Sequence, residues 1–278
     1  MREVSLFSGA GGGLLGSMLL GWEAIAYVEF DDYCQRVIAA RIRDGYLPDA
    51  PIFGDIRAFI GEGYAASYQG VADVITAGFP CQPFSAAGKR AGADDPRNMW
   101  PATIECIRVV RPRFCLLENV PGLLSSGYFG TILGDLAACG YDARWRVLSA
   151  AELGAPHKRD RLWIVGYAAS ATHWNGHNSG SRCWSETALL GEPSCRVGCV
   201  ADANAPGLSD RRQGARDSEQ GRGAAIDRCG STWWAVEPPL GRVANGVADR
   251  VDQLRAIGNG QVSPVVAAAW RLLTEGCR

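Results

Sequence analysis

The chain has 278 residues, of which 47% are hydrophobic and 21% are charged, which is typical of globular domains and excludes disorder over the whole chain. Its 28 basic and 29 acidic residues give a formal net charge of −1, so any contact with nucleic acid must come from a local surface. Apolar runs stay shorter than the roughly 18 residues of a membrane-spanning helix, the first residues do not resemble a secretion signal, and the ten cysteines are scattered singly. We therefore expect a cytoplasmic protein without membrane contact.

Residues 1–167 repeat one pattern, in which a short β-rich run ends in a Gly, Pro or acidic loop and a helical stretch follows. The predicted strands lie near residues 4–7, 24–28, 72–77, 114–117, 144–148 and 162–167, and the predicted helices near residues 14–20, 32–43, 99–110 and 131–139. This alternation predicts an α/β fold with a doubly wound, mainly parallel sheet, whose ligands bind at the carboxyl ends of the strands.

The composition changes after Tyr167. Residues 168–240 are rich in Gly, Ser, Asn, Arg and Trp and have no sustained period of 2 or 3.6, which predicts a small loop-rich insert. Periodicity returns in residues 247–254, and residues 262–273 are predicted to form a final helix. We therefore expect a ligand-binding domain at 1–167, an insert at 168–240, and a segment at 241–278 whose helix returns to the first domain.

The first predicted strand leads into a glycine-dense turn at residues 6–16, Leu-Phe-Ser-Gly-Ala-Gly-Gly-Gly-Leu-Leu-Gly. It contains a Gly-x-Gly-x-x-Gly pattern that begins at Gly11, and such glycines let the backbone pass close to a nucleotide-like ligand. Glu29 ends the next strand, where a carboxylate can bind ribose hydroxyls, and Asp55 places a carboxylate in a third loop. The pattern favours a ligand site over a purely structural turn and leaves NAD and S-adenosylmethionine open.

A second segment places a cysteine between two prolines on a loop. Cys81 lies in Gly-Phe-Pro-Cys-Gln-Pro-Phe-Ser, residues 78–85, directly after a predicted strand. A structural cysteine usually lies in an apolar strand or helix, as we expect for Cys106 and Cys115, whereas a nucleophile must be presented and deprotonated. Cys81 is therefore a candidate nucleophile, and the alternative is that the prolines only stiffen a turn.

Two further strand ends carry charged groups. Glu118 follows an apolar strand in Cys-Leu-Leu-Glu-Asn-Val-Pro, where its carboxyl could protonate or hydrogen-bond a ring nitrogen of a base. Residues 154–162 form a basic cluster, Gly-Ala-Pro-His-Lys-Arg-Asp-Arg-Leu, that enters another apolar strand. Taken alone, Glu118 and the residue after it are also compatible with a simple turn after the strand. The basic cluster alone is also compatible with a solvent-exposed start of a strand.

These segments, together with Gly258-Asn259-Gly260, resemble in order and spacing the motif series of DNA (cytosine-5) methyltransferases of bacterial or phage type. The most specific part is Pro-Cys-Gln-Pro-Phe-Ser followed by Glu-Asn-Val and Arg-Asp-Arg. The resemblance covers residues 3–167 and about 240–275, and the unmatched middle is where this family places its variable target recognition domain. Three positions depart from the family pattern: Ser5 replaces a frequent Asp, His157 a common Gln, and the Gly-Asn motif is one residue longer before its proline.

The resemblance implies a Rossmann-like methyltransferase fold with S-adenosylmethionine as cofactor. Glu29 would hold the ribose, Phe30 and Ile56 would sandwich the adenine, and Asp55 would bind its amino group. The implied cofactor residues are Phe7, Gly9, Gly11, Glu29, Phe30, Asp55, Ile56, Gly78, Pro80 and Asn259.

The resemblance also implies a covalent mechanism on a cytosine flipped out of double-stranded DNA. Cys81 would attack C6, Glu118 would hold N3 and the amino group, and Arg159 and Arg161 would orient the base and support the thiolate. A base inside a duplex cannot be attacked from above its ring, so extrusion must come first.

Contacts to DNA are expected from two groups of residues. These are Ser85, Lys89 and Arg90 after the nucleophile, and Arg211, Arg212 and Arg216 in the insert. His173-x3-His177 with Cys195-x3-Cys199 raises a zinc site, but Cys-x3-Cys is looser than usual zinc spacing, so no metal is predicted.

The expected function is therefore cytosine C5 methylation at a short DNA sequence, by a chain that acts as a monomer on DNA, with a restriction endonuclease as a separate cognate partner. An RNA (tRNA) cytosine-5 methyltransferase of the same fold remains an alternative because the insert is short and the net charge is neutral. A catalytically inactive DNA-binding relative and a nicotinamide oxidoreductase are further alternatives. The former would leave intact catalytic residues unexplained, and the latter would leave Cys81 and Glu118 unexplained.

Overall fold

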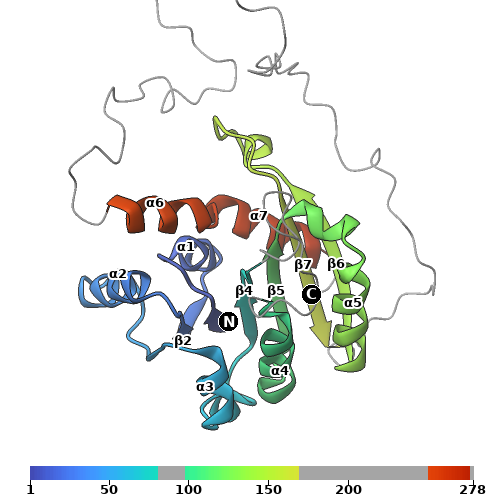
Figure 1. The fold of residues 1–278 in the computed structure, drawn as a ribbon, viewed down its shortest axis with the longest axis horizontal. Helices are drawn as coiled ribbons and strands as arrows, with labels where there is room; N and C mark the ends of the chain where they lie inside the picture. Colours follow the sequence, from blue (N-terminus) through green and yellow to red (C-terminus); the bar gives the residue numbers. More distant parts are fainter. Residues whose placement is uncertain (81–97, 169–249, 276–278) are drawn as a thin grey trace, which may run out of the picture. The chain divides into compact units, whose positions relative to one another are not determined.

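The computed structural model describes residues 1–80, 98–168 and 250–275, which belong to one compact unit. A seven-stranded sheet forms the centre of these described residues, in the order β3-β2-β1-β4-β5-β7-β6 (Figure 1). The strands are β1 (Arg2–Leu6), β2 (Glu23–Val28), β3 (Ile52–Phe53), β4 (Val74–Ala77), β5 (Phe114–Asn119), β6 (Tyr141–Leu148) and β7 (Arg161–Ala168). The predicted α/β class with a mainly parallel sheet is confirmed.

The sheet changes direction at one edge. Strands β1 to β5 pair in parallel, whereas β7 runs antiparallel to both β5 and β6. The chain builds β2 and β3 on one side of β1 and then crosses to place β4 on the other side. Such a reversal of strand order opens a crevice at the carboxyl ends of the two central strands, which is where doubly wound sheets bind ligands.

Helices cover both faces of the sheet (Figure 1). They are α1 (Gly12–Leu19), α2 (Asp32–Arg43), α3 (Ile56–Gly61), α4 (Trp100–Val110), α5 (Tyr128–Ala138), α6 (Arg250–Asn259) and α7 (Ser263–Thr274). Short 3-10 turns occupy Ala65–Tyr68, Pro121–Ser125 and Ala151–Leu153. Local signals explain the helix starts: the Asp31 side chain accepts a hydrogen bond from the Cys34 N–H at the start of α2, and a proline stands in the first turn of α4 and of α7.

The alternation of side chains along β5 divides the core in two. Cys115 and Leu117 pack into a cluster with residues of α3, α4 and α5, whereas Phe114 and Leu116 pack into a second cluster with α7. The strand is apolar on both faces because helices cover both of them. Helix α7 packs mainly against α1, β6 and β7.

Two elements at the edge of the sheet were not predicted. Strand β3 has two residues and helix α3 has six, and both are too short for a periodic pattern to emerge from the sequence. Helix α5 and strand β6 begin earlier than predicted, at Tyr128 and Tyr141. Among the described ranges, no helix is long and apolar enough to cross a membrane.

Candidate active site

Four strands deliver the predicted site residues to one edge of the sheet. Leu6 pairs with Val28 on β2 and with Ala77 on β4, and Ala77 pairs with Leu117 on β5. The residues that follow these four are Phe7, Glu29, Gly78 and Glu118. Because the strands are parallel and paired in register, these four residues lie side by side at the same edge of the sheet. The glycine-rich turn and Glu118 therefore lie at one edge.

Glu29 connects the first two loops of this edge. Its Oε2 accepts a hydrogen bond from the Gly9 N–H at 2.6 Å, and its Oε1 accepts one from the Asp31 N–H at 2.8 Å. Burial raises the pKa of this carboxyl, and the backbone N–H groups of Asp31 and Gly9 oppose that rise. Beside it, the Phe30 side chain is 77% exposed. A buried carboxylate next to an uncovered aromatic ring suits a nucleoside, which offers hydroxyls and a flat base.

The backbone of the glycine-rich turn is shaped for a close approach. Phe7 has φ of 54° and Gly9 has φ of 55°, both in the left-handed region, which is unusual for a phenylalanine. A Cβ added at Gly9 would meet open space, so its glycine is needed for the backbone conformation. Gly11 also has a positive φ, of 93°, and caps the start of α1.

Two other glycines of the turn, Gly12 and Gly16, make room for the closing segment, defined as residues 258–262, and for α7. A Cβ on Gly12 would lie 2.4 Å from the carbonyl oxygen of Gln261, and one on Gly16 would lie 2.5 Å from Cβ of Val266. The sequence pattern predicted that these glycines serve a nucleotide. That remains a prediction; the structure shows in addition that Gly12 and Gly16 allow the C-terminal part of the chain to pack against α1.

The third loop, which carries Asp55, is fixed by a hydrogen bond at the start of α3. The Asp55 side chain accepts a hydrogen bond from the Arg57 N–H at 2.8 Å and so caps α3. Ile56 is buried in the core, whereas Phe30, its predicted partner in holding adenine, is open. The sandwiching of a base by these two side chains remains a prediction.

Beneath the glycine-rich turn lies a buried carboxyl that the sequence analysis did not consider. Oε1 of Glu3 accepts hydrogen bonds from the Ser17 hydroxyl at 2.9 Å and the Thr76 hydroxyl at 2.5 Å, which ties β1 to α1 and β4. Burial raises the pKa of Glu3 to about 7. In the sequence, Glu3 looks like an ordinary exposed glutamate at the start of a strand. Nothing in the sequence therefore indicates this hydrogen-bond network.

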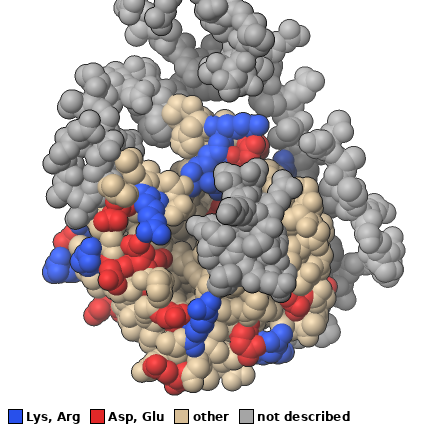
Figure 2. Space-filling model, viewed as in Figure 1, with Lys and Arg blue, Asp and Glu red and all other residues tan. Residues whose placement is uncertain are grey.

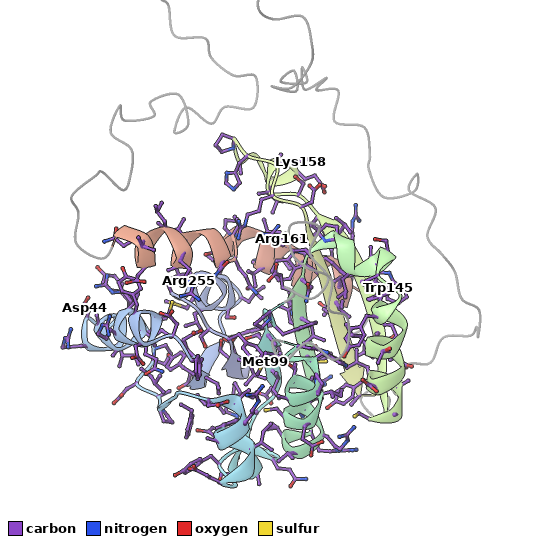
Figure 3. All side chains as sticks on the ribbon, viewed as in Figure 1. Asp44, Met99, Trp145, Lys158, Arg161 and Arg255 are labelled. Carbon is purple, nitrogen blue, oxygen red and sulfur yellow. The ribbon has the colours of Figure 1, made fainter. Side chains whose placement is uncertain are left out.

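Glu118 forms a partly buried ion pair at the other end of the site. The Arg161 Nε lies 2.9 Å from Glu118 Oε1, and the exposed fractions of the two side chains are 24% and 12%, respectively. Burial raises the pKa of Glu118, while Arg161 is the strongest influence that lowers it. Arg161 begins β7 and points toward the centre of the molecule, whereas Lys158 lies on the projecting loop between β6 and β7 (Figure 3).

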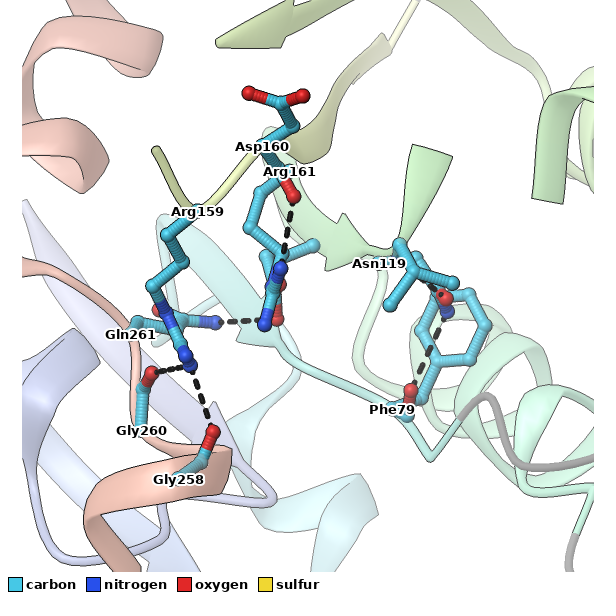
Figure 4. Close-up of polar contacts among 10 residues, drawn as sticks. Phe79, Asn119, Arg159, Asp160, Arg161, Gly258, Gly260 and Gln261 are labelled. Carbon is cyan, nitrogen blue, oxygen red and sulfur yellow. Dashed lines mark hydrogen bonds and ion pairs between the residues drawn. The ribbon is translucent and has the colours of Figure 1, made fainter. Parts of the chain in front are cut away.

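Arg159 contacts the closing segment. Its Nη2 donates hydrogen bonds to the carbonyl oxygens of Gly258, at 2.9 Å, and Gly260 (Figure 4). Arg159 has φ of 41°, a strained value for a non-glycine residue. Burial, followed by the charge of Arg161, lowers its pKa below the usual value for arginine. The two predicted arginines therefore have different partners.

The start of the Cys81 loop is anchored to β5. The Asn119 Nδ2 donates to the Phe79 carbonyl oxygen at 3.3 Å (Figure 4). The Phe79 ring packs against Trp100 with ring centroids 5.3 Å apart. Gly78 and Pro80 flank this anchor, and Gly78 passes close to Glu118. Asn119 is thus a supporting residue whose role was not predicted, although it stands beside Glu118 in the sequence.

A cavity lies between the glycine-rich turn and Glu118. Five of the predicted residues line it: Phe7, Gly9, Gly78, Glu118 and Asn259. Gln261 lines it too and was not predicted, because a glutamine inside a Gly-Asn motif gives no sequence signal of its own. Residues predicted for the cofactor thus share a cavity with the carboxyl predicted to hold the base.

Several predicted residues lie outside the described residues. They are Cys81, Ser85, Lys89, Arg90, Arg211, Arg212 and Arg216, together with the His and Cys residues considered for zinc. Within the described ranges there is no group of three or more His, Cys, Asp or Glu side chains that could hold a metal ion. On the face shown in Figure 2, described Lys and Arg side chains are interspersed with Asp and Glu.

Comparison with known proteins identifies the family. The family model described as C-5 cytosine-specific DNA methylase matches residues 1–187. The chain belongs to this family. It is 36% identical over 168 residues to the type II methyltransferase M.NgoMIV of Neisseria gonorrhoeae, an alignment that covers 59% of this chain and 50% of the relative.

Two further similar proteins are a second type II methyltransferase and a protein of known structure. The type II methyltransferase M.NaeI of Lentzea aerocolonigenes is 37% identical, over 59% of this chain and 39% of the relative. A prophage-encoded E. coli protein, described as a DNA modification methyltransferase, has a crystal structure that matches 61% of this chain and 47% of its own, with 27% identity and a TM-score of 0.49. The chain spans about half the length of the first curated relatives that it matches.

Proposed function

We propose that this chain transfers a methyl group from S-adenosylmethionine to C5 of a flipped-out cytosine in a specific short DNA sequence. The observation that carries the proposal is the position of Glu118. Its carboxyl is paired with Arg161 in a partly buried position and lines the same cavity as Phe7, Gly9 and Asn259. A base held at Glu118 would therefore lie beside a ligand held by the glycine-rich turn.

The residues at the first end of the site fit S-adenosylmethionine. Glu29 offers a buried carboxylate for the ribose hydroxyls, and the exposed ring of Phe30 offers a face for the adenine. Gly9, Gly11 and Pro80 would shape the backbone around the cofactor, with Gly78 and Asn259 across the cavity. When bound, the cofactor supplies an electrophilic methyl group on a sulfonium.

The chemistry assigned to the protein follows from the weakness of cytosine C5 as a nucleophile. In the proposed mechanism the thiolate of Cys81 adds to C6 while Glu118 holds N3 and the 4-amino group, which makes C5 enamine-like. C5 then takes the methyl group, a base removes the C5 proton, and the electron pair of that C–H bond restores the 5,6 double bond and expels the Cys81 thiolate. Arg161 holds the Glu118 carboxyl in place through these steps.

The proposed function also specifies a substrate, a recognition region and DNA contacts. Double-stranded DNA is the substrate, residues 168–240 form the target recognition region, and the chain acts as a monomer in the cytoplasm. A restriction endonuclease that cleaves the same sequence would act separately. Arginines 211, 212 and 216 and the segment 85–90 would contact the DNA.

The experiment that tests the proposal maps 5-methylcytosine at single-base resolution in DNA from a methylation-free bacterial host that expresses the chain. A Cys81→Ser variant serves as the control. We expect methylation at one short motif in the wild type and none in the control. Unmethylated DNA despite soluble protein would contradict the proposal, and methylation that survives in the control would contradict the covalent mechanism.

A further inference from the structure

Gln261 occupies a space that three glycines keep open. A Cβ added to Gly13 would lie 2.6 Å from Gln261 Oε1, and one added to Gly78 would lie 2.8 Å from Gln261 Nε2. Its backbone lies against Gly12 in the same way. These distances are shorter than real Cβ contacts, so the side-chain amide fits between the glycine-rich turn and the end of β4 only because both positions lack a side chain.

The backbone on both sides of Gln261 is held in place. Arg159 donates to the carbonyl oxygens of Gly258 and Gly260, and the Ser263 hydroxyl donates to the Gly12 carbonyl oxygen at 2.8 Å. The amide therefore reaches its position with its main chain already ordered, so little further entropy is lost when it makes a contact.

The amide contacts the carboxyl that would hold the base. Gln261 Nε2 donates to Glu118 Oε2 at 3.4 Å, while Arg161 Nε lies 2.9 Å from Glu118 Oε1 (Figure 4). Each carboxylate oxygen thus has one donor, and the donors come from different elements. A carboxylate oxygen has two lone pairs, so each oxygen keeps one for a substrate.

A neutral hydrogen-bond donor suits position 261 better than a further cation. Arg161 and Arg159 already place positive charge near Glu118, and its pKa is lowered most by Arg161, then by the Gln261 hydrogen bond and then by Arg159. A third cation would favour the ionised carboxylate still more, whereas Glu118 must present a proton or share one when it holds cytosine N3, which is an acceptor. An amide orients the second oxygen without adding a further positive charge.

We propose that Gln261 is a positioning residue that orients Glu118 toward cytosine N3 and the 4-amino group, with Arg159 acting through the closing segment to place it. The inference rests on the proposed methyl transfer to cytosine. It gives Gln261, which follows Gly258-Asn259-Gly260, a role toward the base, whereas Asn259 of the same motif is assigned to the cofactor.

The first test compares Gln261→Met with the wild type and with Gln69→Met, which changes an exposed glutamine far from the site. Methionine fills a similar space without a donor. We expect kcat for methyl transfer to fall about tenfold in Gln261→Met, with the calorimetric Kd for S-adenosylmethionine within about twofold of the wild type. An unchanged kcat, or a loss confined to the Kd, would overturn the inference.

The second test uses a donor that pH can switch on. In Gln261→Glu the new carboxyl offers an O–H donor only when it is protonated. We expect the ratio of kcat for Gln261→Glu to kcat for Gln261→Met to rise as the pH falls, toward about tenfold. A ratio that stays constant with pH would show that the donor is irrelevant and would overturn the proposal.

A third measurement is independent of activity. The titration of the Glu118 side-chain carboxyl carbon, followed by NMR in the full chain and assigned with Glu118→Gln, should move to higher pH in Gln261→Met because a hydrogen bond to the charged form is lost. An unmoved midpoint would refute the contact. A wild type that does not methylate DNA would refute the proposed function, while this midpoint would still decide the contact between Gln261 and Glu118.

Discussion

The two ends of the candidate active site are assembled from contacts of very different range along the chain. Glu29 binds the N–H groups of Gly9 and Asp31, which lie within 20 residues of it in sequence. The contacts of Gly258 with Arg159 and of Gln261 with Glu118 span 99 and 143 residues. The cofactor end is thus built by neighbouring strand-loop-helix units, whereas the base end is complete only when the closing segment has packed against α1.

The largest effect is expected at the base end. Glu118→Gln keeps the shape of the side chain but removes the acid, so methyl transfer should fall by about 10²-fold to 10⁴-fold while the Kd for S-adenosylmethionine stays unchanged. Single-turnover rates at saturating cofactor would measure the loss, with the exposed Glu62→Gln as a matched control. A Glu118→Gln rate close to that of Glu62→Gln would remove Glu118 from the mechanism.

A large effect of pH on stability is expected below the cofactor end, at Glu3. Its pKa of about 7 in the folded protein exceeds the ordinary 4.5, so the stability it contributes is present below pH 4.5 and is lost as the pH rises through 7. Glu3→Gln should therefore gain about 3 kcal/mol relative to the wild type between pH 4.5 and pH 8.

Urea unfolding of the full chain across this pH range would measure the Glu3 effect, with the exposed Glu23→Gln as its control. Any constant cost of the new amide cancels, because only the change with pH is compared. A difference between Glu3→Gln and wild type that does not vary with pH would show that Glu3 titrates normally.

The packing of α7 against α1 can be disturbed directly at Gly16. An added methyl would overlap Val266, so Gly16→Ala should cost about 1–3 kcal/mol of stability and lower activity through the base end. Gly134→Ala in α5 is the matched control, because a Cβ there meets open space and alanine favours a helix. Thermal unfolding would compare the two. Equal stabilities of Gly16→Ala and Gly134→Ala would mean that α7 can move away from α1 at little cost in free energy.

The smallest expected effect isolates the cofactor end. Glu29→Gln retains one acceptor for the Gly9 or Asp31 N–H but loses the charge, so the Kd for S-adenosylmethionine should rise about tenfold while the Glu118 ion pair is undisturbed. Isothermal calorimetry measures this change. If kcat at saturating cofactor also fell by an order of magnitude, the two ends would not be as separate as their contacts indicate.

Prediction from sequence succeeded where a signal is local. Glu29 and Glu118 were recognised because each follows an apolar strand, and parallel strands must bring such ends together. Sequence-based prediction missed β3 and α3, because elements this short show no hydrophobic period. It also did not predict the contacts of Gly12 and Gly16 with the closing segment and α7. Arg159 was recognised by its motif, but its hydrogen bonds to Gly258 and Gly260 could not be anticipated.

The sequence by itself determined the alternation of strands and helices, the parallel sheet and the set of side chains at its carboxyl edge, because hydrophobic period and strand-end residues are properties of short segments. Only the tertiary structure decided which oxygen of Glu118 meets Arg161 and which meets Gln261, and that the glycines of the turn admit the closing segment. Those contacts join residues that lie far apart along the chain, 143 positions for Gln261 and Glu118, or depend on a missing Cβ, and neither leaves a periodic trace in the sequence.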